Sequence, residues 1–377
     1  MLRMMQQLPD AIQAFLKTYL RRWNGRDNRE EILALLQFLP RSQYEKLRED
    51  YLEPLENAIL DHTASSRSAL LDLYARLIRQ WGVRLRTEEP HFSPDGFTPL
   101  ISLITHAEYL SLSLMELPLS AGDEKSKTIA TAVIELYSTL AELYSHAANN
   151  GNIRLTVPLA ATVYTLTFTS NLAQISLLCS VLATYKSSFE ASLVSSALQS
   201  PVKSVGAFYA SEMVGLFNGY IMDICNLIWR NRGLNSEDPN ALGCLIPKPT
   251  KTALNEYIND SNDMLKLRRK RSDSGPAFHY SLQTMFSLSH HVALADHSAA
   301  CFTAFEEQNM QTDEGGEKPR LRKPVTQKNL TALDKDGGVK MSWQDYRVKM
   351  LDWFDERGSE GIGRLMRSTM KALRKST

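Results

Sequence analysis

The sequence is poor in cysteine, and its few cysteines follow no disulfide or metal-binding pattern. The 377 residues include 4 cysteines, and no two of them have CxxC spacing. Small disulfide-rich domains and zinc modules bring closely spaced cysteines together. We therefore expect reduced, buried thiols, as in a cytosolic or nuclear protein. Residues 1–13 lack a sustained apolar core and a small-residue cleavage site, so we expect no secretory signal peptide.

Long apolar runs are also missing. The stretch Leu155–Tyr185 carries no formal charge, but threonine, serine, asparagine and glutamine interrupt it repeatedly. A transmembrane helix needs about 20 predominantly apolar residues in succession. We therefore expect no membrane span, and we interpret this stretch as two core helices that meet near Ser170–Asn171.

Neither sign of charge dominates. Lysine and arginine number 43, and aspartate and glutamate number 42. The part of the chain from Lys248 onward is net positive, and the part before it is net negative. This split indicates an anionic partner for the C-terminal part, if it has one.

Patterns typical of strands and of common catalytic sites are absent as well. Alternation of apolar and polar residues occurs only at Thr162–Thr169, where the flanking helical patterns favour a helix. There is no GxSxG, phosphate-binding glycine loop, HExxH or paired-cysteine motif. We accordingly predict a protein that is not an enzyme and needs no cofactor.

What the sequence does contain is apolar residues at steps of three and four, which predict amphipathic helices along most of the chain. Pro54 falls inside one of these helices, where it should cause a kink. The helix expected at Val205–Trp229 is apolar nearly all round and should be buried among others. Helix lengths vary without a fixed period, so we predict an all-α fold, an irregular HEAT-like helical-hairpin solenoid.

Composition divides the chain into three expected parts. Residues 1–308 should form the solenoid, with late helices near Lys251–Asn259, Tyr280–His291 and Ala293–Glu307. Residues 309–340 are rich in charge, glycine and proline and should form a flexible linker, and Leu267–Gly275 should also be disordered. Residues 341–377 should form a pair of amphipathic helices.

Four blocks of sequence resemble the fungal centromere protein I family. The most specific is "FNGYIMDICNLIWRNRGLNSEDPNALGCLIP" (Phe217–Pro247). The others are "LCSVLATYKSSFE" (Leu178–Glu190), "LKTYLRRWNG" (Leu16–Gly25) and "LLDLYARLIRQW" (Leu70–Trp81). These are packing motifs, so the resemblance concerns a fold and an assembly, without a chemistry.

The resemblance implies a structural subunit of the inner kinetochore, within the constitutive centromere-associated network. Such a protein acts in the nucleus at centromeres, and supports kinetochore assembly and chromosome segregation. Family members are longer than this chain, which resembles their C-terminal part. The implied partners are the centromere proteins H and K, although the part of the family that usually docks them is expected to be missing.

Basic residues form three clusters that are candidates for binding an anionic partner. One run is a candidate for nuclear import or phosphate contact with DNA, with a plain solvated loop as the alternative: Lys266, Arg268, Arg269, Lys270 and Arg271. A second patch lies in the expected linker: Lys318, Arg320, Arg322, Lys323 and Lys328. The last helix has a basic face that is either a partner surface or simply exposed: Arg364, Arg367, Lys371 and Arg374.

Two further features leave alternatives open. His290, His297 and Cys301 have spacings that share one helical face, which would suit a zinc-dependent helical enzyme or merely a core. Asp223 lies in an apolar helix and should be paired if it is buried, with Arg230 or Arg232 as the expected partner. A HEAT-type transport or trafficking adaptor is the third possible function.

Overall fold

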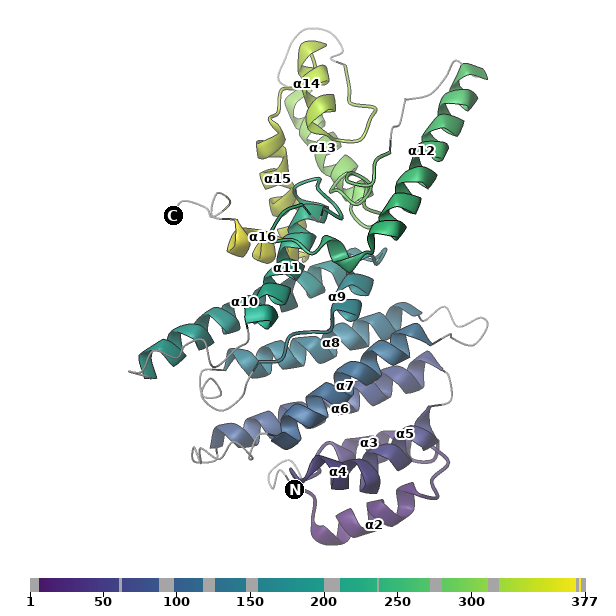
Figure 1. Ribbon diagram of the computed structural model, residues 1–377, viewed down its shortest axis with the longest axis vertical. Helices are drawn as coiled ribbons and strands as arrows, with labels where there is room; N and C mark the ends of the chain where they lie inside the picture. Colours follow the sequence, from purple (N-terminus) through teal and green to yellow (C-terminus); the bar gives the residue numbers. More distant parts are fainter. Residues whose placement is uncertain are drawn as a thin grey trace. The chain divides into compact units, whose positions relative to one another are not determined.

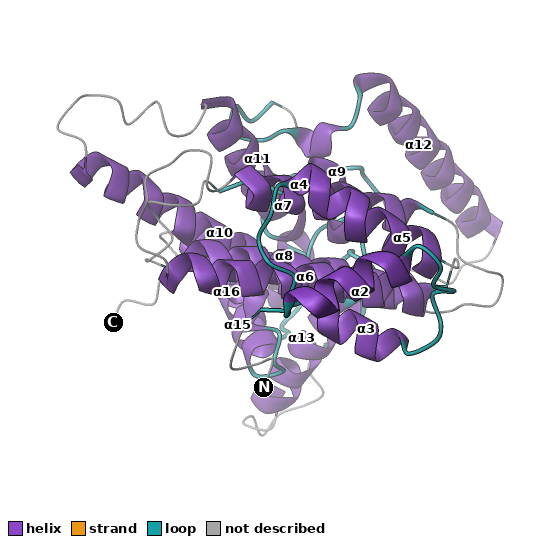
Figure 2. Ribbon diagram, turned by 90° about the horizontal axis from the view of Figure 1, so that it is seen from below, coloured by secondary structure: helices purple, strands orange, loops and turns teal. Residues whose placement is uncertain are grey.

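The computed structural model describes residues 7–60, 63–87, 98–117, 126–146, 155–199, 211–235, 237–271, 280–310, 319–370 and 373. Within these ranges the chain forms helices and turns and contains no strand (Figure 2). The predicted all-α class is therefore confirmed. The segment Thr162–Thr169, which has some strand-like alternation, is helical as far as Thr167.

The chain divides into two compact units, which differ from the three parts expected from composition. Unit 1 comprises residues 1–162 and 181–208, and unit 2 comprises residues 163–180 and 209–377. The uncharged stretch Leu155–Tyr185 contributes to two helices that supply residues to both units, and they meet where expected, with a break at Ser170–Asn171. They are α9 (Ala160–Thr167) and α10 (Leu172–Gln199).

Unit 1 begins with a group of short helices and continues with three long ones, which Figure 1 shows in successive layers. The short elements are α2 (Asp10–Leu20), α3 (Arg29–Leu36), α4 (Tyr44–Leu47), the π-helical turn η1 (Arg48–Leu52) and α5 (Glu53–Ile59). The long helices are α6 (Ala64–Thr87), α7 (Thr98–Glu116) and α8 (Ser126–Ser145). The irregularity expected at Pro54 takes the form of η1, because a π-helical turn accommodates a missing backbone donor.

The core of unit 1 is centred on α6, which contacts α7 and α8. Its apolar stripe is completely buried: Leu70, Leu71, Tyr74, Leu77, Ile78 and Trp81 are each at most 1% exposed. The Trp81 indole donates a hydrogen bond to the Leu39 carbonyl at 2.9 Å, so its polar group is satisfied in the core. Gly82 lets α8 approach closely, because a Cβ there would lie 2.3 Å from a Leu143 methyl.

Unit 2 contains the helix that carries the most specific family block. Its elements are α11 (Ser211–Ile228), the 3₁₀ turn η5 (Gly243–Leu245), α12 (Lys248–Arg271), α13 (Ala295–Met310), α14 (Gln327–Lys335), α15 (Trp343–Asp355) and α16 (Glu360–Thr369). Of the helix expected at Val205–Trp229, residues 205–210 lie outside the described part; the described faces of α11 are mostly buried, as expected, including Phe217, Ile221, Ile224 and Ile228. No helix among the described residues has the length and apolar content required to cross a membrane.

Three sequence expectations differ from the structure of unit 2. The expected linker contains α14, because Thr326 caps this helix and Leu330 and Leu333 are buried beneath it; residues 311–318 lie outside the described part. The expected disorder from Leu267 is wrong as far as Arg271, where α12 continues; residues 272–279 are outside the described part. Residues 281–294 form successive turns, where a helix was expected from Tyr280 to His291.

The predicted C-terminal helix pair is present but packs as part of unit 2. Ser342 caps α15, accepting a hydrogen bond from the Asp345 N–H at 3.0 Å. The Arg347 guanidinium lies 5.0 Å from the centre of the Trp229 ring at the end of α11. A Cβ on Gly361 would lie 1.8 Å from the Ser176 carbonyl oxygen, so a glycine is required where α16 meets α10.

Candidate functional site

The loop after α11 is fastened to that helix by one buried carboxylate. Asp223, only 2% exposed, accepts four hydrogen bonds. Its Oδ1 accepts from the backbone N–H of Leu242 at 3.1 Å and of Gly243 at 2.9 Å. Its Oδ2 accepts from the Cys244 N–H at 2.8 Å and from the Tyr164 hydroxyl at 2.6 Å. The expected pairing with Arg230 or Arg232 is wrong, because a neutral hydroxyl and three backbone donors satisfy this carboxylate.

An unusual backbone conformation aims these N–H groups at Asp223. Gly243, Cys244 and Leu245 have φ of +61°, +57° and +56°, so three successive residues form a left-handed turn. This conformation costs about 1–2 kcal/mol for each non-glycine residue. Successive backbone N–H groups in such turns make a concave anion-binding nest. Here the anion is the chain's own Asp223, whose charge-assisted hydrogen bonds offset the strain.

Gly219 provides the second point of attachment, one helical turn before Asp223. A Cβ at Gly219 would lie 2.4 Å from Cγ of Leu242, so the missing side chain makes room for the leucine. The spacing of four places Gly219 and Asp223 on the same face of α11. This face therefore receives the loop through one apolar and one polar contact.

The chemistry of this site is that of an anchor. Burial raises the pKa of Asp223, and the hydrogen bonds from Tyr164 and from three backbone N–H groups oppose that rise. Burial also raises the pKa of the Cys244 thiol, which keeps the sulfur protonated and poorly nucleophilic near neutral pH. Each Asp223 oxygen already accepts two hydrogen bonds, so the carboxylate is not poised to remove a proton from a substrate. What the turn presents to solvent is Leu245, 51% exposed.

The residues of the zinc alternative do not converge. His290 lies in a turn before α13, and its Nδ1 is 3.0 Å from the Ser287 hydroxyl. His297 packs its ring against Phe354, with 6.3 Å between ring centres, and Cys301 is buried. In the described part of the chain, no three histidine, cysteine or acidic side chains are arranged to hold a metal ion. The helical phase that joined the three residues in the sequence is interrupted at residues 281–294.

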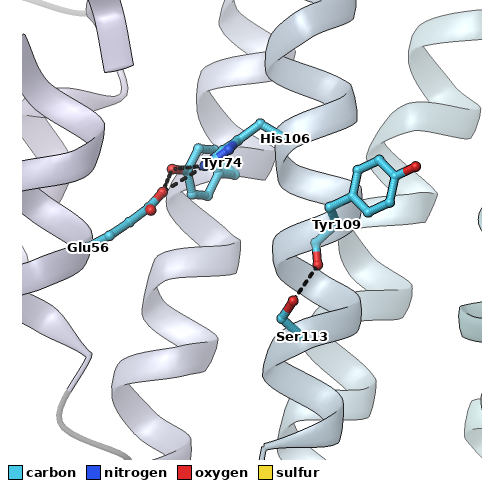
Figure 3. A network of polar contacts seen from close by, with 5 residues as sticks. All are labelled: Glu56, Tyr74, His106, Tyr109 and Ser113. Atoms are coloured by element: carbon cyan, nitrogen blue, oxygen red, sulfur yellow. Dashed lines mark hydrogen bonds and ion pairs between the residues drawn. The ribbon is translucent and has the colours of Figure 1, made fainter. Parts of the chain in front are cut away.

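Unit 1 contains a polar network that the sequence did not predict. Glu56 on α5, Tyr74 on α6 and His106 on α7 meet at one point (Figure 3). His106 Nε2 lies 2.7 Å from the Glu56 carboxylate and 3.1 Å from the Tyr74 hydroxyl, and this hydroxyl also donates to Glu56. Burial raises the pKa of Tyr74 well above its usual value, so its proton stays in place. The network links three helices through the interior, and no sequence spacing indicates it because each helix supplies one residue.

The first basic run continues α12. Lys266 is exposed and forms an ion pair with Asp263 at 2.8 Å. The backbone remains helical through Arg268, Arg269, Lys270 and Arg271, whose side chains lie outside the described part. The run is therefore the end of a helix, where a loop was the alternative interpretation.

The other two basic clusters have different surroundings. In the second patch Arg320, Arg322, Lys323 and Lys328 are exposed, and Lys318 is outside the described part. On α16, Arg364 donates to the Ser180 hydroxyl at 3.1 Å. Arg367 forms ion pairs with Asp352 at 3.3 Å and Asp355 at 2.7 Å, which hold its guanidinium against α15. Lys371 and Arg374 lie outside the described residues.

No protein-family model matches the chain, and no curated protein matches its sequence.

Proposed function

We propose that this chain is a non-enzymatic structural scaffold of the inner kinetochore, acting in the nucleus at centromeres. The proposal is supported by the family block Phe217–Pro247, which comprises most of α11 and the loop fastened to it. Asp223 belongs to this block and holds the loop through the four hydrogen bonds described above. A sequence motif that serves packing and has no reactive centre fits an assembly subunit.

The observation that carries the scaffold proposal is the exposure of α12. This helix extends away from the other helices of unit 2 (Figure 1). Among its described side chains only Ile258 and Asn262 are buried. Tyr257 is 72% exposed and Met264 is 55% exposed, and their spacing of seven places them on one face. An apolar stripe on an extended helix is a surface that a partner can cover.

The charges beside this stripe indicate the kind of partner surface that would bind it. Glu256 and Asp260 are exposed on the flank of the helix next to Tyr257 and Met264. An amphipathic helix of another subunit would bury its apolar face on this stripe, and lysine or arginine at its edge would meet the two carboxylates. By resemblance, the centromere proteins H and K are the first candidates, and DNA contact through Arg268, Arg269 and Arg271 is a further element of the proposal.

Purification of the tagged full-length chain from dividing cells, with identification of co-purifying proteins, tests this function. We expect inner-kinetochore subunits with the wild type, and a loss of at least tenfold with Tyr257→Asp/Met264→Asp. Thr252→Asp/Asn259→Asp is the matched control, because these exposed residues have the same spacing on the opposite side of α12 and should leave co-purification unchanged. Trafficking components in place of kinetochore proteins would favour the adaptor alternative. One tightly bound zinc per chain, lost with His297→Ala, would favour the enzyme.

A further inference from the structure

A groove crosses the surface of unit 1 between the end of α2 and the stretch formed by η1 and α5. Its volume is about 440 Å³, which lies within the range of about 300–1,000 Å³ typical of ligand sites. Leu20 and Trp23 line it but are only 1% and 7% exposed, half-buried Pro54 contributes apolar surface, and Glu49, Glu53 and Asn57 contribute polar groups. This groove lies outside unit 2, where the proposed docking helix α12 is found.

The π-helical turn explains why two carboxylates line this groove. π-helical turns add a residue within a helix and are frequent at functional sites. In η1, Asp50 points inward, where it is buried and forms an ion pair with Lys17 at 2.7 Å. Glu49 on η1 and Glu53 at the start of α5 are both exposed and line the groove four residues apart. The π-helical turn therefore places Asp50 in the interior and leaves Glu49 and Glu53 at the surface.

The neighbouring wall is held close by a glycine. Gly25 has φ of +73°, and a Cβ there would lie 1.9 Å from the Ala58 carbonyl oxygen. Only glycine permits this approach of the chain after α2 to α5. The Trp23 indole donates to the Asp27 carbonyl at 2.8 Å, which fixes the ring beside the groove. The site is therefore bounded by backbone and by an immobilised aromatic ring.

The electrostatics of the groove favour a cation. The groove is lined by two carboxylates and by one guanidinium, that of Arg21, so negative charge predominates. Within the described part of the chain, neither Glu49 nor Glu53 forms a hydrogen bond or an ion pair through its side chain. The C-terminal end of α2 adds partial negative charge nearby. Nucleic acid would meet repulsion here, whereas a basic side chain would find both apolar and negatively charged surface.

We propose that this groove binds a lysine or arginine side chain presented by a protein partner. The aliphatic stem of that side chain would lie against Pro54 and the accessible edge of Trp23, as long basic side chains do on apolar surface. Its charged end would lie between Glu49 and Glu53. The Trp23 ring adds the attraction of an aromatic ring for a cation.

Nuclear magnetic resonance of the indole N–H groups in the full-length chain tests this proposal. The signal of Trp23 is identified by its loss in Trp23→Phe. The probes are acetylated and amidated tripeptides, Ala-Arg-Ala and Ala-Lys-Ala, with Ala-Glu-Ala for comparison. We expect a saturable shift of the Trp23 signal with the two basic peptides and no shift with the acidic one.

Charge-neutral variants complete the test. Glu49→Gln/Glu53→Gln should weaken binding of the arginine peptide at least tenfold, while the exposed pair Glu30→Gln/Glu45→Gln should leave it unchanged. Both lining carboxylates are exposed, so the thermal midpoint should stay at the wild-type value; if the double variant does not fold, Glu53→Gln alone takes its place. The absence of any shift, an equal shift with the acidic peptide, or undiminished binding in the variant would overturn the proposal. None of these outcomes bears on α12.

Discussion

The Tyr164 hydroxyl donates a 2.6 Å hydrogen bond to Asp223, joining α9 to α11 within unit 2. The same carboxylate holds three backbone N–H groups of the loop that leads into α12. Two helices and the start of the exposed helix thus depend on one side chain. The left-handed turn directs these N–H groups at the carboxylate, so the conformation of the loop and the contact support each other.

Removal of the anchor should destabilise the chain, and loss of the carboxylate should cost more than loss of one of its donors. Tyr164→Phe removes one hydrogen bond to a charged acceptor and should lower the free energy of unfolding by about 2 kcal/mol. Asp223→Ala leaves three buried N–H groups and one hydroxyl without an acceptor and should cost about 4 kcal/mol. Chemical denaturation measures both, with the exposed substitution Asp260→Ala as the control. Equal stability of Asp223→Ala and wild type would show that the anchor is unimportant.

Two glycines one turn apart on α11 should respond in opposite directions to the same substitution. Gly215 is exposed and a Cβ there meets nothing within 4 Å, so Gly215→Ala should stabilise the helix by about 0.5–1 kcal/mol. At Gly219 the added methyl would overlap Leu242 at 2.4 Å, so Gly219→Ala should displace the loop and lower the thermal midpoint. Midpoints that shift in the same direction would contradict the docking of Leu242 on α11.

Glu108 on α7 should make the stability of the chain depend on pH. This residue is 4% exposed, and burial raises the pKa of its carboxyl to about 8, although the nearby Tyr137 hydroxyl favours the charged form. The unfolded chain releases this proton near pH 4.3, whereas the folded chain keeps it up to about pH 8. The contribution is therefore fully present below about pH 4.3 and is lost as the pH rises toward 8.

Denaturation at several pH values checks the role of Glu108. Between pH 5 and 8 the free energy of unfolding should fall by up to about 1.4 kcal/mol per pH unit from this group. Glu108→Gln cannot ionise, so it should remove that part of the slope and should be more stable than wild type at pH 8. An unaltered slope in the variant would mean that Glu108 is already ionised in the folded chain.

The basic end of α12 should contribute to DNA affinity without reading bases. Arg268→Ala/Arg269→Ala/Arg271→Ala should weaken binding to duplex DNA equally for unrelated sequences. The slope of log K against log salt should fall in magnitude by up to about 3, because each phosphate contact contributes about 0.9. The exposed residues Arg26 and Lys46 provide a control when changed to alanine. If the affinity and its salt dependence match the wild type, this basic run does not contact DNA.

The periodicity of apolar residues was sufficient to predict the helical class, and local signals were sufficient for several boundaries. Ser342 caps α15 and Gly358, with φ of +71°, follows its end, as their residue types indicate. Contacts between distant segments were not predictable in the same way. Asp223 is paired with the Tyr164 hydroxyl and with backbone N–H groups of the loop after α11. The direction of these N–H groups depends on a left-handed turn that no residue pattern predicts.

The same limit applies to the candidate sites. His290, His297 and Cys301 matched a helical spacing, but turns at residues 281–294 change their relative directions. Conversely, Glu56, Tyr74 and His106 meet although they lie on three separate helices. Packing of the C-terminal helix pair on α10 and α11 requires Gly361 and Arg347, whose partners are far away in sequence.

The central claim, a scaffold that is recruited to centromeres through an exposed helix, is tested most directly by imaging the fluorescently tagged full-length chain in dividing cells. We expect discrete nuclear foci that coincide with a centromere marker for the wild type and for Thr252→Asp/Asn259→Asp. We expect a diffuse signal for Tyr257→Asp/Met264→Asp at equal protein abundance. Wild-type fluorescence that is spread through the cell, or that gathers on transport vesicles, would contradict recruitment to centromeres.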